Sequence, residues 1–200
     1  MSPFDLVFAV FGLLLGLAIA EVLSGFSRAL KLKRGSKPVR IGWLTPLLGA
    51  LAMLDLSNFW LLAWDARDQI GANYVTLVCV LVMVGIYYLA ATLIFPDEPE
   101  EWPDFDDWYD KQKAMVVGGL LTANVASWIG VAVLDAMHPL PAAAIVTPDA
   151  TAELLYFVSG FAILGLFAAL LTVKSRRWNL VMLIAICGFL TISGITEPYV

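Results

Sequence analysis

The stretch that decides the fold runs from Leu6 to Arg40. Its first part, residues 6–26, reads LVFAVFGLLLGLAIAEVLSGF, and its second part, residues 27–40, reads SRALKLKRGSKPVR. The first part is long and apolar enough to cross the roughly 30 Å hydrocarbon core of a bilayer as a helix. The second part adds six basic residues directly after it. An apolar run followed by a basic connection is typical of a membrane span that leads into a cytoplasmic loop.

The composition of the whole chain agrees with a membrane protein. Of its 200 residues, 60% are hydrophobic and 14% are charged, whereas soluble domains have about 45–50% apolar and about 25% charged residues. These proportions exclude an ordinary soluble fold and a disordered chain. The formal net charge of −5 also argues against a nucleic-acid partner, so the lipid bilayer is the expected surroundings.

Five further apolar runs follow the first, and all six are continuous rather than alternating, which favours helices over strands. We therefore predict an all-α fold, a single domain of six transmembrane helices in one bundle. The predicted spans are residues 6–26, 41–64, 74–95, 114–134, 151–173 and 179–196.

The basic residues predict how this bundle is threaded. With six spans, the first, third and fifth connections lie on one side and hold 11 of the 12 Lys and Arg residues, and Arg67 alone lies on the other side. Since basic loops stay in the cytoplasm, both termini are expected outside. Asp5 precedes the first apolar run and the basic cluster follows it, which indicates an uncleaved first helix. We expect the plasma (inner) membrane of a bacterium.

Four polar side chains fall inside the predicted spans and form a candidate intramembrane path: Glu21, Asp55, Asn58 and Asn124. At 1.5 Å per residue, Glu21 lies about 10 Å from the basic end and Asn58 about 27 Å. Acids at such depth are costly and are usually functional. Because no Lys or Arg lies within the spans, we expect Glu21 or Asp55 to be protonated or to bind a cation. Interhelical hydrogen bonding is the structural alternative.

Small residues recur at every fourth position of the first span, at Gly12, Gly16, Ala20 and Ser24. Residues four apart share one face of a helix, and small side chains let helix backbones approach closely in lipid. This pattern predicts a helix-packing interface. The interface either lies inside the monomer or joins copies in a homo-oligomer.

The third connection combines acidic and aromatic residues. Proline at 103 and acids at 104, 106 and 107 suit the start of a helix, and the aromatic residues then share one face. We expect a short amphipathic helix on the cytoplasmic surface, or a segment that docks a protein partner. Its residues are Trp102, Asp104, Phe105, Asp106, Asp107, Trp108, Tyr109 and Asp110.

Asp106, Asp107 and Asp110 spell D-D-x-x-D, which resembles the magnesium–diphosphate motif of prenyl-transferring enzymes. The second acidic motif of those membrane enzymes is missing, and hard cations need several converging oxygens. The only histidine, His138, cannot provide a His-rich zinc site or bis-histidine haem ligation. We therefore predict no catalytic residue, metal or cofactor.

Three functions remain open at this point. The first is a non-catalytic subunit that self-associates or docks a partner through the acidic aromatic segment. The second is a small oligomeric channel or transporter for protons or cations that uses Glu21 and Asp55. The third, ranked last, is an enzyme at the cytoplasmic interface that uses Asp106, Asp107 and Asp110 with magnesium.

Overall fold

The computed structural model describes residues 3–34, 39–71, 73–98, 101–139 and 149–197. Within these ranges the chain forms six α-helices, each long and apolar enough to cross a membrane, and no β-strand, as predicted. The short 3-10 helix η1 (Ala66–Asp68) follows the second of them. The six helices are α1 (Pro3–Lys33), α2 (Leu44–Asp65), α3 (Tyr74–Thr92), α4 (Phe105–Met137), α5 (Ala150–Thr172) and α6 (Arg176–Thr196).

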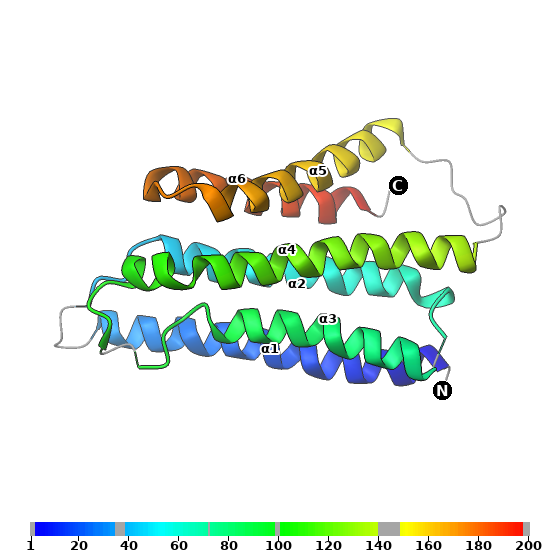
Figure 1. The fold of residues 1–200 in the computed structure, drawn as a ribbon, viewed down its shortest axis with the longest axis horizontal. Helices are drawn as coiled ribbons and strands as arrows, with labels where there is room; N and C mark the ends of the chain where they lie inside the picture. The colour runs from blue at the N-terminus through cyan, green and yellow to red at the C-terminus, as the bar shows by residue number, and fades with distance from the viewer. Residues whose placement is uncertain (1–2, 35–38, 72, 99–100, 140–148, 198–200) are drawn as a thin grey trace.

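The helices lie side by side in three layers (Figure 1). The first layer holds α1 and α3, the middle layer α2 and α4, and the third layer α5 and α6. Around the bundle, neighbours follow the order α1, α3, α4, α5, α6, α2, and α2 also contacts α4 across the middle. The two central helices therefore separate the outer pairs and have most of their neighbours within the protein.

Side chains at the helix starts explain where three of the helices begin. The side chain of Asn73 accepts a hydrogen bond from the Thr76 amide at 2.9 Å at the start of α3. Asp104 does the same for α4 and Asp149 for α5, at 2.8 and 3.0 Å. Asn and Asp are preferred at this position because the first amides of a helix have no intrahelical acceptor.

Two helices extend well beyond the predicted spans. α1 continues through the basic residues to Lys33, and α4 begins at Phe105 rather than near residue 114. The expected short amphipathic helix is thus not a separate element, since residues 105–113 form the first turns of α4. At 1.5 Å per residue, these helices reach about 46 and 50 Å, longer than the roughly 30 Å hydrocarbon core.

A stripe along one face of each central helix builds the core. On α2 the buried positions include Leu44, Leu48, Leu51 and Asp55, whose spacings of four and three residues keep them on one side of the helix. Asp55 occupies a position that the preceding turns fill with leucine, and only 2% of it is exposed. The fold therefore holds this acidic residue inside the bundle.

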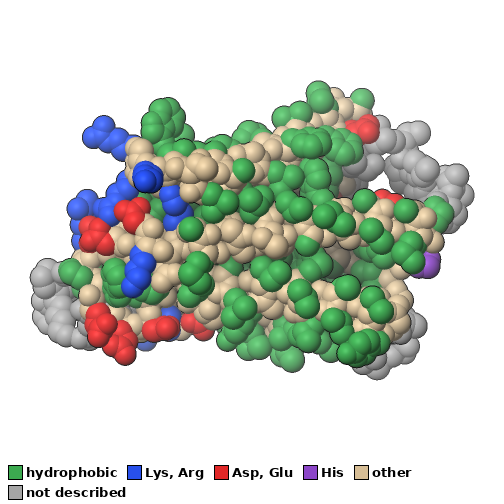
Figure 2. Space-filling view, viewed as in Figure 1, with side chains coloured by type: hydrophobic (Ala, Val, Ile, Leu, Met, Phe, Trp, Pro, Cys, Tyr) green, Lys and Arg blue, Asp and Glu red, His purple; other side chains and the backbone are tan. Residues whose placement is uncertain are grey.

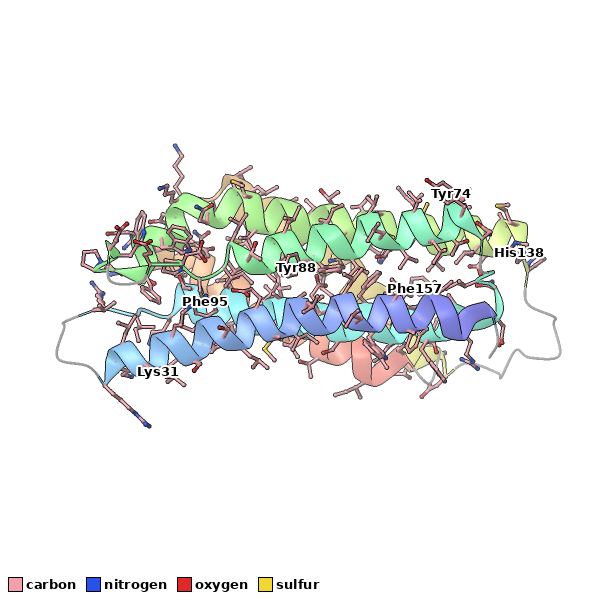
Figure 3. The ribbon with its side chains drawn as sticks, turned by 90° about the horizontal axis from the view of Figure 1, so that it is seen from below. Lys31, Tyr74, Tyr88, Phe95, His138 and Phe157 are labelled. Atoms are coloured by element: carbon pink, nitrogen blue, oxygen red, sulfur yellow. The ribbon has the colours of Figure 1, made fainter. Side chains whose placement is uncertain are left out.

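Charge separates the two ends of the bundle. Figure 2 shows Lys and Arg gathered at one end and apolar side chains covering the middle. The start of α1 and the end of α6 lie at the opposite end (Figure 1), and Figure 3 places Lys31 at the basic end and Tyr74 and His138 at the other. Lys37, one of the predicted basic loop residues, lies outside the described residues. Which end faces the cytoplasm remains a prediction.

Candidate functional site

A cavity of about 290 Å³ lies between the helices in the half of the bundle away from the basic end. Helices α2, α4 and α6 all run from the basic end of the bundle to the opposite end (Figure 1). The cavity residues that come late in these helices therefore lie in the part of the cavity nearest that opposite end, which we call its outer part. From Asn124 to Asp135, both on α4, the cavity spans about 16 Å at 1.5 Å per residue. Its polar lining consists of Asp55, Asn58, Tyr87, Asn124, Ser127, Asp135, Tyr156, Ser193 and Glu197.

Asp55 forms the inner end of the cavity. Nδ2 of Asn124 donates to both carboxylate oxygens of Asp55 at 3.0 Å and also lies 3.0 Å from the Leu120 carbonyl oxygen. The Tyr87 side chain also lines the cavity. The carboxylate is thus held by the Asn124 amide, and no Lys or Arg of the described residues pairs with it.

Asn58 lies one turn further along α2 and reaches across to α6. Its Nδ2 donates to the Leu190 carbonyl oxygen at 2.9 Å. Gly194 allows this approach, because a Cβ atom there would lie 2.6 Å from Oδ1 of Asn58. This contact joins α2 to α6 along the cavity wall.

The outer part of the cavity carries two more acids. Asp135 accepts a hydrogen bond from Gln69 at 2.7 Å. Glu197 lies just beyond the end of α6. Burial of its side chain, together with the neighbouring Asp65 carboxylate, raises the pKa of Glu197 to about 7. A carboxyl group with such a pKa can exchange a proton near neutral pH.

Apolar side chains close the cavity towards the basic end. The turns of α2, α4 and α6 that lie between the cavity and the basic end have buried leucine, isoleucine and valine at their core positions. Among the described residues these are Leu48, Leu51, Val117, Leu183 and Ile186, each at most 1% exposed. The cavity therefore does not continue to the basic end in this conformation.

Glu21, the fourth predicted path residue, lies elsewhere. It is not among the residues that line the cavity, and its Oε1 lies 3.4 Å from Nη2 of Arg28. The expectation that no cation is available to Glu21 was therefore wrong. Because α1 continues past the predicted end of the span at Phe26, Arg28 stays two turns along the same helix face and its long side chain reaches back.

The small residues of α1 divide between inside and outside. A Cβ atom on Gly12 would lie 3.0 Å from the Trp60 ring, so Gly12 packs against α2 within the monomer. Gly16, Ala20 and Ser24 are exposed, and a Cβ on Gly16 would meet nothing within 4 Å. Of the four predicted interface residues, Gly12 thus packs against another helix of the same chain, whereas the other three are exposed.

The aromatic residues of the predicted docking segment are largely used within the protein. Phe105 and Tyr109 are 1% exposed, and the Trp108 indole donates to the carbonyl oxygens of Leu93 and Ile94 at 3.2 Å. Trp102 packs edge-on against Trp108, with ring centroids 4.9 Å apart. Phe105 and Tyr109 are therefore buried away from any partner, whereas Trp102 and Trp108 are half-buried.

The acids of this segment tie the basic connections to the start of α4. Asp104 lies 3.6 Å from Arg40, and Arg176 contacts Asp107 and Asp110 at 2.5 and 2.7 Å. Asp106 accepts instead from the Leu44 amide at 3.3 Å. Within the D-D-x-x-D motif, Asp107 and Asp110 therefore share Arg176, whereas Asp106 faces the Leu44 amide.

Gly42 makes room for this connection. Its φ of +59° is readily adopted by glycine, and a Cβ there would collide with the Asp106 carboxylate. Arg40 also exchanges backbone hydrogen bonds with Pro103 and Phe105, at 2.8 and 2.9 Å. The first connection is thus held directly against the beginning of α4.

Sequence reasoning missed several polar residues of the cavity, among them Tyr87, Asp135, Tyr156 and Glu197. Tyr87 and Tyr156 resemble other aromatic residues of apolar spans. Asp135 and Glu197 follow long apolar runs, where an acid is expected simply to end a span. The available signal was that Asp135 lies in the last turn of α4 and Glu197 directly after α6. Using this signal required knowing that both helices line one cavity.

No protein-family model matches this chain, and no curated protein or solved structure matches it significantly. A function for this protein therefore has to come from the chemistry of its own residues.

Proposed function

We propose that this protein is a small, non-catalytic membrane carrier that admits protons or a small cation into the cavity as far as Asp55. The observation that carries this proposal is the Asp55 carboxylate, which is 2% exposed and lines the cavity. A buried acid without a cationic partner is expensive in a membrane. Binding of a proton or cation would remove that cost.

The charges around the cavity support a positively charged ligand. Three lining residues are acids, namely Asp55, Asp135 and Glu197, and none of the lining residues is Lys or Arg. A concave site lined by one sign of charge raises the local concentration of oppositely charged ions. Anions would be repelled from the same cavity.

The apolar closure beyond Asp55 favours a carrier over an open channel. Carriers bind their substrate near the middle of the bilayer and open to each side in turn. In this arrangement the cavity opens to the end of the bundle at which α1 begins and α6 ends. With the basic end in the cytoplasm, as the distribution of Lys and Arg predicts, the ligand enters from outside the cell.

Reconstitution in liposomes tests this proposal, because the two intramembrane acids provide a matched pair. Proteoliposomes given an inward gradient of protons, sodium, potassium or tetramethylammonium should show flux above that of empty liposomes for at least one of these ions. Asp55→Asn should abolish the flux, whereas Glu21→Gln, the same change outside the cavity, should retain it. Flux that survives Asp55→Asn, or no flux for any of these ions, would contradict the carrier.

A subunit that assembles with other copies is a second candidate function. It is favoured by the exposed small residues Gly16, Ala20 and Ser24 on α1, because helices in lipid associate closely through such faces. The exposed acids at the basic end, Asp107 and Asp110, would then dock a partner with basic residues. Native mass spectrometry after mild extraction distinguishes a monomer from an assembly of copies or a complex with another protein.

A further inference from the structure

Aromatic side chains make up a large part of the cavity wall. They come from four different helices, α2, α3, α4 and α5, and they surround the space that leads to Asp55. Glycine at 160 lets α5 approach Trp128, since a Cβ there would lie 2.6 Å from the indole ring. The aromatic lining residues are Phe59, Tyr87, Trp128, Tyr156 and Phe157.

Such a wall suits a cation that carries carbon. The face of an aromatic ring attracts an ammonium group within about 6 Å of its centroid, and alkyl groups gain from leaving water for an apolar surface. A bare metal ion needs several oxygen ligands at short distance. Within the described residues, no group of three or more Asp, Glu, His or Cys side chains converges on one point.

The size of the cavity also suits a small organic molecule. At about 30 Å³ for the volume of one water molecule, the 290 Å³ cavity corresponds to a ligand on the order of ten non-hydrogen atoms. This volume lies near the lower limit of small-molecule sites, which are roughly 300–1,000 Å³. A proton or a single metal ion would leave most of the space to water.

The Asp55 carboxylate can accept a further hydrogen bond. Each of its oxygens has two acceptor positions, and Asn124 provides a single donor atom to the pair. Because Asp55 is the one carboxylate at the inner end of the cavity, this part of the cavity matches a ligand with one positive charge. Asn58 and Ser127 provide neutral polar groups nearby.

We propose that the cavity binds a small organic ammonium ion, with its nitrogen at Asp55 and its carbon groups against the aromatic wall around Trp128. This inference rests on the carrier proposed above and specifies its substrate class. It predicts that the protein prefers alkylammonium ions to potassium and to protons alone.

Equilibrium binding to the purified full-length protein in detergent tests the inference. Calorimetric titration with tetramethylammonium and with ethylammonium chloride, at constant ionic strength, should show saturable binding at least about 10-fold tighter than for potassium chloride. Asp55→Asn should weaken this binding at least about 10-fold, and Trp128→Leu about 3- to 10-fold. Trp178→Leu is the matched control, because Trp178 is exposed at the opposite end of the bundle, outside the cavity.

The outcomes separate this inference from the carrier itself. Asp55-dependent binding or flux of protons, sodium or potassium, without binding of either alkylammonium ion, would overturn the substrate class and leave the carrier intact. Alkylammonium binding that is equal in wild type and Asp55→Asn would overturn the site. If Asp55→Asn fails to give a monodisperse helical protein, the comparison of Trp128→Leu with Trp178→Leu decides, and equal affinities in those two variants would overturn the proposal.

Discussion

A pair of glycines on α1 allows the packing of the first layer to be measured. A Cβ atom on Gly25 would lie 2.2 Å from Cδ2 and 2.4 Å from Cγ of Phe95, and 2.8 Å from its Cβ. Favourable carbon contacts are about 3.5–4.0 Å. Phe95 is 3% exposed and packs against Phe26 with ring centroids 5.0 Å apart. The ring therefore has little room to move away.

We predict that Gly25→Ala destabilises the protein relative to Gly16→Ala. Both substitutions replace a glycine inside the same helix, so the gain in helix propensity, about 1 kcal/mol, is common to them. A Cβ on Gly16 meets nothing within 4 Å. The difference between the variants thus reports the overpacking at Phe95, which we expect at about 1–3 kcal/mol, near the upper limit because three ring and side-chain atoms are too close.

Reversible unfolding in mixed detergent micelles, followed by circular dichroism, measures this difference. The double variant Gly25→Ala, Phe95→Ala should lose less stability than the sum of the losses in the two single variants, because removing the ring makes room for the new methyl group. Equal stabilities of Gly25→Ala and Gly16→Ala, within about 0.5 kcal/mol, would show that α1 does not approach Phe95 as described.

Three further outcomes can be checked with the same purified protein. Gly16→Leu should not lower the unfolding free energy of a monomer, because the position is open. A smaller particle in size-exclusion chromatography would therefore report a broken self-association, and an unchanged size would exclude that face. Arg176→Gln should lower stability by at most about 1 kcal/mol and in a salt-dependent manner, since the ion pairs with Asp107 and Asp110 are partly exposed; a loss that high salt does not reduce would contradict a surface ion pair. The raised pKa of Glu197 means that the folded protein binds the Glu197 proton more tightly than the unfolded chain, so this group favours folding at low pH and its contribution is lost as the pH rises towards about 7. Thermal midpoints at pH 5 and pH 8 should therefore differ less in Glu197→Gln than in wild type, and an identical pH dependence would contradict the assignment.

The sequence by itself determined the features that depend on one segment and its surroundings, namely which segments form membrane-spanning helices and where some of those helices begin. Residues 6–26 and the five later runs predict helices because hydrocarbon provides no hydrogen-bond partners for the backbone, and this requirement does not depend on neighbouring segments. The helix starts at Asp104 and Asp149 are local in the same way. The segregation of Lys and Arg follows from helix count alone.

Only the tertiary structure decided which intramembrane polar residues meet. Glu21 and Asp55 look alike in sequence, as acids inside apolar spans, yet Glu21 pairs with Arg28 and Asp55 joins Asn124 in the cavity. The difference comes from the rotation of each helix about its axis and from the order of helices around the bundle, which places α2 beside α4 and α6. Both depend on contacts between distant parts of the chain, and six similar apolar runs carry little information about them.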